Sequence, residues 1–188
     1  MTRNRVTGFT LIEAMVVITL MVILLAIGVP QFRNFAARRA MTAQVAELAN
    51  TIRLARTEAI KRGFPVSICR SDNPEAAFPS CSNGAAGQGW ASGWILFVDR
   101  GARGVINDGD VVIRVQPPFA NSGGIATPDG STYTLTFLPN GIAVGAAQRL
   151  VFSPNLSTSD PGYSDLQKSM CISFNGSTRL VEGATTCS

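Results

Sequence analysis

The chain has 188 residues, of which 46% are hydrophobic and 15% are charged, with a net charge of +4. This balance excludes a disordered chain and fits one globular domain joined to an anchor. Residues 9–188 keep 14 of the 16 basic side chains and all 12 acidic ones, a net charge of +2, which argues against a surface dedicated to coating nucleic acid.

The N-terminal region passes from a short basic stretch into a long apolar run. Residues 14–29 are almost wholly apolar, and the full stretch 9–29 would form about 30 Å of helix, enough to cross a bilayer. No Ala-x-Ala cleavage site follows it, so the pattern favours a retained anchor over a removed signal peptide. Arg3 and Arg5 precede the run, which predicts a cytoplasmic N-terminus and a domain on the other side of the membrane.

One acidic residue lies at the start of this run, in the sequence Gly8-Phe9-Thr10-Leu11-Ile12-Glu13. An acid inside a membrane helix costs roughly 2.5–3.5 kcal/mol, so it usually has a partner or a task. The segment resembles the class III signal of type IV pilins and type II secretion pseudopilins. This resemblance implies that a prepilin peptidase cuts between Gly8 and Phe9, that Phe9 is then N-methylated, and that Glu13 pairs with the N-terminal ammonium of a neighbouring subunit during assembly.

A second helical pattern continues beyond the membrane. Its apolar residues recur at steps of three and four and form one stripe, made of Met41, Val45, Leu48, Ile52, Ala55 and Ala59. Polar residues are expected on the opposite face, among them Arg39, Gln44, Glu47, Asn50, Arg53 and Lys61. Pro30 predicts a kink near the membrane exit, and Gly63 and Pro65 predict the end of the helix.

From Phe64 onward the apolar period changes to two, which predicts β-strands. The expected strands are Pro65–Cys69, Trp94–Asp99, Val111–Gln116, Tyr133–Leu138, Arg149–Ser153, Cys171–Phe174 and Thr178–Glu182. Asn107-Asp108-Gly109 predicts a hairpin turn, and the segments 70–91 and 153–169 are expected to be loops. We therefore predict an α+β fold with four segments: leader 1–8, membrane and filament-core helix 9–30, amphipathic helix 31–63, and β-rich domain 64–188.

The layout of the domain resembles the FimT/GspH group of minor pilins and pseudopilins. The similarity rests on the helix end Leu54–Arg62, the following Val66–Cys69, Gly93–Asp99, Asp108–Asp110, Val112–Val115 and Phe137–Gly141. This resemblance implies the type IV pilin fold, a long N-terminal helix packed on an antiparallel sheet. It also implies a low-copy subunit rather than the abundant subunit of the shaft.

Four cysteines are present, at positions 69, 81, 171 and 187. They lack the paired C-x-x-C spacing of a zinc site, and the chain has no histidine, so we expect no metal site. An even number in a translocated domain predicts two disulfides. Three pairings are open, and we prefer Cys69–Cys81 with Cys171–Cys187 because each closes a local loop.

Candidate catalytic residues are lacking, because the commonest general base is absent and no nucleophile motif occurs. We therefore expect no enzyme activity and no cofactor. Asp99, Asp108 and Asp110 could bind a hard cation, but turn chemistry explains them better.

DNA is a further candidate partner. Some FimT-like minor pilins carry a C-terminal Gly-Arg-x-Arg motif for DNA uptake, and Gly176-Ser177-Thr178-Arg179 matches only its glycine and last arginine. Arg149, Lys168 and Arg179 could cluster as DNA contacts, although few phosphate contacts supply little affinity.

The sequence thus predicts a minor pilin of a type IV pilus that contributes to filament initiation or to the tip. The expected partners are other pilin or pseudopilin subunits, a prepilin peptidase and the inner membrane. The alternatives are a minor pseudopilin of a type II secretion system and a DNA-binding minor pilin.

Overall fold

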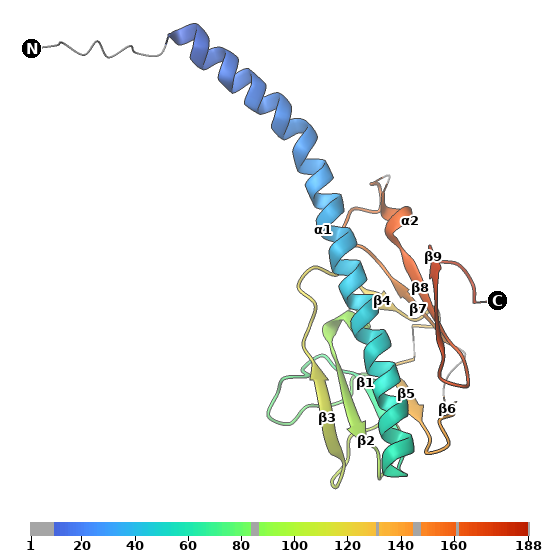
Figure 1. Cartoon of the computed structure of the whole chain (residues 1–188). Helices are drawn as coiled ribbons and strands as arrows, with labels where there is room; N and C mark the ends of the chain where they lie inside the picture. Colours follow the sequence, from blue (N-terminus) through green and yellow to red (C-terminus); the bar gives the residue numbers. More distant parts are fainter. Residues whose placement is uncertain (1–9, 84–86, 131, 145–147, 161, 188) are drawn as a thin grey trace, which may run out of the picture. The chain divides into compact units, whose positions relative to one another are not determined.

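The computed structural model of the chain describes residues 10–83, 87–130, 132–144, 148–160 and 162–187 (Figure 1). The chain divides into two compact units, Met1–Ala36 and Ala37–Ser188. One continuous helix, α1 (Leu11–Arg62), belongs to both units. The expected leader and Phe9 lie outside the described residues.

The first unit contains the apolar half of α1, and this helix continues through Pro30. From Leu11 to Val29 its large hydrophobic side chains are exposed. The hydroxyl of Thr19 donates a hydrogen bond to the Met15 carbonyl oxygen at 2.8 Å, so the polar group inside the apolar run is satisfied by its own helix. Among the described segments, α1 is the helix long and apolar enough to cross a membrane.

The second unit begins with the amphipathic half of α1, which buries one face against the strands. The predicted stripe is buried there, apart from Val45, which is partly buried at the edge of the core. The helix ends at Arg62, as expected, because Gly63 adopts a left-handed conformation (φ 70°) and its N–H bonds to the Ala59 carbonyl oxygen.

One antiparallel sheet of the second unit has five strands in the order β3-β2-β1-β5-β6. These are β1 (Val66–Arg70), β2 (Trp94–Val98), β3 (Val111–Gln116), β5 (Thr134–Phe137) and β6 (Ala143–Val144), with the short 3₁₀ helix η1 (Trp90–Ser92) before β2. The strands β1 and β2 are buried along their whole length, so both faces of the sheet centre are covered. A turn at Asn107–Asp110, closed by the Asp110 N–H on the Asn107 carbonyl oxygen, lies between β2 and β3 as expected.

A second antiparallel sheet has four strands in the order β4-β7-β8-β9. Its members are β4 (Ile125–Ala126), β7 (Gln148–Phe152), β8 (Lys168–Ile172) and β9 (Thr178–Glu182), with the short helix α2 (Tyr163–Leu166) before β8. Figure 1 shows α1 running across strands of both sheets in this unit. The α+β fold, with a long helix packed on antiparallel strands, is therefore confirmed, and the strands divide into two sheets.

The main core lies where both sheets meet α1. Met41, Leu48 and Ile52 of the helix belong to the same buried cluster as Ile68 and Trp94 of the first sheet. The second sheet contributes Leu150, Phe152, Met170 and Ile172. A smaller cluster of Cys69, Ile95 and Phe97 lies apart from this core and is flanked by Cys81, Ile106 and Val115.

Three local expectations were wrong. The segment 153–169, expected to be a loop, contains the short helix α2. Gln44, which we placed on the polar face, is 1% exposed. Its amide donates to the Asn121 carbonyl oxygen at 3.2 Å and accepts from the Ser122 hydroxyl at 2.9 Å, so its burial costs little. The strand expected at Cys171–Phe174 instead spans Lys168–Ile172, because its first residues already pair with β7 on one side and with β9 on the other.

Candidate assembly site

The start of α1 carries a helix-capping arrangement around Glu13. The backbone N–H of Glu13 donates to the Thr10 hydroxyl at 3.3 Å, and the Ala14 N–H bonds to the Thr10 carbonyl oxygen at 3.2 Å. Thr10 is thus the N-cap residue, and Thr-x-x-Glu is the sequence of a capping box. The Glu13 carboxylate also lies in the first turn, where the helix dipole favours negative charge.

Glu13 is followed by a surface that is apolar on every side. Leu11, Ile12 and Met15 are more than half exposed, and so are many of the larger side chains up to Leu25. A helix that exposes apolar groups all round needs lipid or other apolar helices around it. The arrangement can therefore hold the protein in a membrane and pack against helices of the same kind, with one carboxylate at a fixed position.

Two disulfides tie the β-rich unit together, Cys69–Cys81 and Cys171–Cys187, which is the local pairing we preferred. The first joins β1 to the loop that follows it and is buried at Cys69. The second joins β8 to the C-terminal tail.

The three expected DNA-contacting cations do not form one cluster. Arg149 on β7 and Arg179 on β9 are both register partners of Cys171, so they lie in one row across β8. Lys168 is three residues from Cys171 on the same strand, which places it on the other face of the sheet. Its ammonium lies 3.0 Å from the Glu182 carboxylate, and Arg149 donates to the Ala184 carbonyl oxygen.

Two of the three acidic residues considered for a cation, Asp99 and Asp110, have structural hydrogen bonds. Asp99 is buried and accepts from the Ser67 hydroxyl and from the Gly104 N–H, both at 2.6 Å. Asp110 accepts from the backbone N–H groups of Arg100 and Asn107, which fixes the turn before β3. Among the described residues, no group of three or more His, Cys, Asp or Glu could hold a metal ion.

The Asp72 carboxyl has a perturbed pKa. Burial raises its pKa, but hydrogen bonds from Ser82 and Arg70, together with the Arg70 charge, outweigh this, so the pKa lies below its ordinary value of 3.8. The Arg70 Nη2 atom lies 3.1 Å from the Asp72 carboxylate. This ion pair follows β1 directly and lies within the loop closed by the first disulfide.

Two structural features were missed in the sequence, the N-cap at Thr10 and the burial of Gln44. The cap at Thr10 had a readable signal, the Thr-x-x-Glu spacing before an apolar run. Gln44 also had one, because it follows Met41 by three residues and precedes Leu48 by four, the spacing of the buried stripe itself.

Comparison with known proteins gives two matches to protein-family models. The model described as type II transport protein GspH matches residues 44–178. The model described as prokaryotic N-terminal methylation motif matches residues 3–29.

Two crystal structures of the type IV minor pilin FimU of Pseudomonas aeruginosa (strain PAO1), in different crystal forms, have the same fold at 19% sequence identity. The first covers 82% of this chain and 99% of that chain with a TM-score of 0.53. The second covers 78% of this chain and 99% of that chain with a TM-score of 0.50.

Proposed function

We propose that this chain, which belongs to the GspH family of pilin-like proteins, is a minor pilin that helps to initiate a type IV pilus or to build its tip. The observation that carries the proposal is the construction of α1. Its first half exposes apolar side chains behind a single carboxylate, and its second half closes the core of a disulfide-tied domain. Such a subunit has a folded β-rich domain of its own, while the apolar half of its helix has to be covered by lipid or by the helices of other subunits.

The proposed life cycle follows from the N-terminal methylation motif. A prepilin peptidase removes residues 1–8, and the new N-terminal residue, Phe9, is methylated. Before assembly the apolar helix holds the protein in the inner membrane, with the N-terminus in the cytoplasm and the domain in the periplasm. In the filament, helices of other pilin or pseudopilin subunits replace the lipid. The role is structural, without catalysis.

We propose that Glu13 has a registering role, which means that it aligns this subunit with its neighbour in the filament. Its carboxylate would meet the N-terminal ammonium of the neighbouring subunit. Two charges in an apolar environment satisfy each other only when the subunits are aligned, so a misplaced subunit would leave a buried charge unpaired. Capping of α1 is a competing role for the same side chain, because Glu13 lies in the first turn beside the Thr10 cap.

Two variants separate these roles. Glu13→Gln removes the charge but keeps a side chain that suits a capping box, whereas Thr10→Ala removes the cap and keeps the charge. We expect leader cleavage in both, strongly reduced recovery of Glu13→Gln in sheared filaments, and near-normal recovery of Thr10→Ala. The reverse order of recovery would assign Glu13 to capping and refute the registering role.

The pilus is preferred to a type II secretion pseudopilus because two disulfides stabilise the domain, which suits a filament exposed outside the cell. A deletion strain scored for surface pili, twitching, protein secretion and DNA uptake tests this preference. Loss of pili or twitching supports it. Loss of secretion alone would move the protein to the pseudopilus, and loss of DNA uptake with intact pili would favour DNA capture, for which Arg149 and Arg179 are the candidate contacts.

A further inference from the structure

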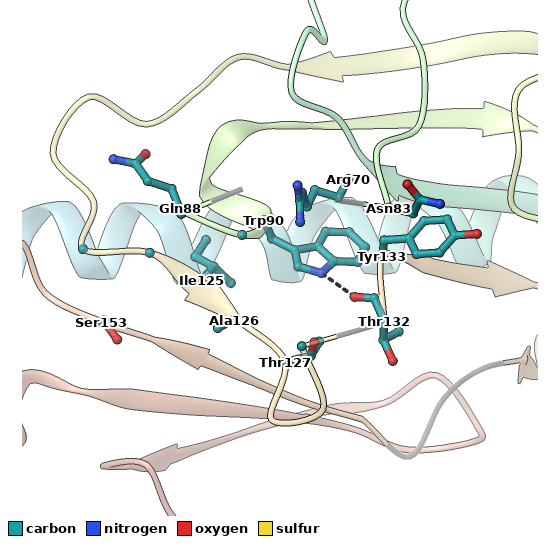
Figure 2. A pocket seen from close by; sticks show the side chains of 15 residues that line it. Arg70, Asn83, Gln88, Trp90, Ile125, Ala126, Thr127, Thr132, Tyr133 and Ser153 are labelled. Carbon is teal, nitrogen blue, oxygen red and sulfur yellow. Dashed lines mark hydrogen bonds between the residues drawn. The ribbon is translucent and has the colours of Figure 1, made fainter. Parts of the chain in front are cut away.

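The arginine side chains that line hollows of the β-rich unit differ in whether their charge is accessible. In the cavity shown in Figure 2, Trp90 is 3% exposed and donates its indole N–H to the Thr132 carbonyl oxygen at 3.1 Å. The arginine of this cavity, Arg70, is also buried and forms an ion pair with Asp72. Its charge is therefore neutralised within the protein.

A different hollow, of about 570 Å³, lies between the last turns of α1 and the turn that joins β8 to β9. Arg53, Arg56, Thr57 and Ile60 line it from the helix, and residues 176–178 line it from the turn; we call it the arginine hollow. Arg53 and Arg56 are three residues apart on the helix, so they are neighbours on its surface and their like charges repel each other.

No carboxylate among the described residues neutralises these two arginines. Arg53 donates to the neutral amide oxygen of Asn50 at 3.0 Å, and Arg56 forms neither an ion pair nor a hydrogen bond with a described residue. The two acids in this half of α1 already pair with other arginines. The arginine hollow is thus a site of positive charge without a counter-charge of its own.

The side chain of Arg56 is held between two tight turns. One turn lies between β5 and β6 and contains Gly141, and the other lies between β8 and β9 and contains Gly176. A Cβ at Gly141 would lie 3.2 Å from the Arg56 Nε atom, and a Cβ at Gly176 would lie 3.3 Å from the Arg56 Cδ atom. The half-buried guanidinium is therefore preorganised, which lowers the entropic cost of binding an anion.

Apolar side chains accompany these cations. Ile60 lines the hollow and is 52% exposed, and the two turns carry Ile142 and Phe174, which are 46% and 64% exposed. Arginine and aromatic residues are enriched at protein–protein interfaces and carry much of the binding energy there. Two cations would give DNA little affinity, because they would neutralise few phosphates. The composition of this surface therefore favours a protein partner over nucleic acid.

We propose that the arginine hollow receives an acidic side chain of a neighbouring pilin or pseudopilin subunit, with an apolar residue of that subunit beside it. The carboxylate accepts hydrogen bonds from the guanidinium groups of Arg56 and Arg53, which match it in charge and geometry. The apolar residue packs against Ile60. This inference rests on the proposed filament role and adds the chemistry of the partner surface.

Charge variants of the full chain, expressed in cells that assemble filaments, test the role of the hollow. Arg53→Glu reverses the charge of an exposed side chain, and Arg56→Gln removes the second charge. We expect each to lower recovery of this protein in sheared filaments about tenfold, because close ion pairs across an interface are worth at least that much. Arg103→Glu, which reverses an exposed arginine outside the hollow, is the matched control and should incorporate normally.

The amount of each variant in the membrane shows whether it folds. If the half-buried Arg56→Gln variant does not accumulate, the exposed Arg53→Glu variant keeps the test decisive.

A photoreactive amino acid introduced at Thr57, an exposed position in the hollow, identifies the partner segment. Cross-linking in intact filaments, followed by mass spectrometry, should join this position to a pilin-type subunit at an Asp or Glu that lies beside an apolar residue. Changing that partner acid to arginine should lower recovery of the wild-type protein and restore recovery of Arg53→Glu.

Recovery of Arg53→Glu equal to that of Arg103→Glu would overturn the inference. A cross-link to lipid, to nucleic acid or to a segment without a carboxylate would do the same, and so would the absence of any cross-link or a charge swap that restores nothing. Absence of the wild-type protein from the filaments would instead refute the filament role itself, so the two failures are distinguishable.

Discussion

Removing the two disulfides should have unequal effects on stability, although they close loops of similar length. The sequence separations are 12 and 16 residues, and loops of this size give about 3 kcal/mol of stabilisation through the unfolded chain. Cys69 is fully buried and packs with Ile95 and Phe97, whereas Cys171 is 8% exposed and its partner Cys187 is exposed. Replacing Cys69 by alanine also leaves a small void, which adds about 1 kcal/mol.

We therefore expect a loss of about 4 kcal/mol for Cys69→Ala/Cys81→Ala and about 3 kcal/mol for Cys171→Ala/Cys187→Ala. Urea unfolding of the full chain in detergent measures both, because Trp90 and Trp94 are buried in the β-rich unit and report on its unfolding by fluorescence. Reduced wild-type protein, with all thiols present, is the control. Larger destabilisation from the C-terminal pair, or losses below about 1 kcal/mol for both, would refute the reasoning.

Three further perturbations test contacts within the β-rich unit, all by the same unfolding measurement. Asp99→Ala should cost about 1–3 kcal/mol, because it leaves the Gly104 N–H without its acceptor and removes one of the two hydrogen bonds of the buried Ser67 hydroxyl, which keeps Thr136 as a partner; an unchanged midpoint would contradict this. Gly176→Ala should cost at least about 1–3 kcal/mol, since φ is +73° and the new Cβ would lie 2.6 Å from the Phe137 ring; an unchanged midpoint would contradict this. The pKa of Asp72 is lowered in the folded state, so its stabilisation is present at neutral pH and is lost as the pH falls below 3.8. Asp72→Asn should therefore be slightly less stable than wild type at neutral pH, with a difference that shrinks in acid; a difference that grows as the pH falls would contradict this.

The regular elements were predictable because their signals are local. The helix end at Gly63 follows from one residue's conformational freedom, and β3 and β9 have the predicted bounds because alternation and flanking turns define them. The strands β4 and β6 have two residues each, which is too short for any period to show. They are defined by their neighbours, as in the pairing of Ile125 with Phe152.

The errors came from judging single residues by polarity. Gln44 was assigned to the polar face although its helical position lies on the apolar stripe, and only the folded chain brings Asn121 and Ser122 to its amide. Lys168 was left in a loop because its cross-strand partner Glu182 is distant in sequence. The same limit applies to the arginine hollow, whose lining comes from α1 and from the turn between β8 and β9, which no local pattern connects.

The two halves of α1 have different roles in the proposed assembly. The second half of the helix belongs to the core of the domain, with Leu48 and Ile52 buried, so it is fixed before assembly. The first half exposes its apolar side chains and needs other helices or lipid to cover them. A change in the core should thus reduce the amount of folded protein, whereas a change at Glu13 should leave the folded domain intact and act on incorporation alone.

The most direct test of the minor-pilin assignment is mass spectrometry of the N-terminal peptide of this protein, recovered from sheared surface filaments. The account predicts that the protein is present at low copy and that its first residue is N-methylated Phe9. Protein that is absent from the filaments, or that retains residues 1–8, would contradict it.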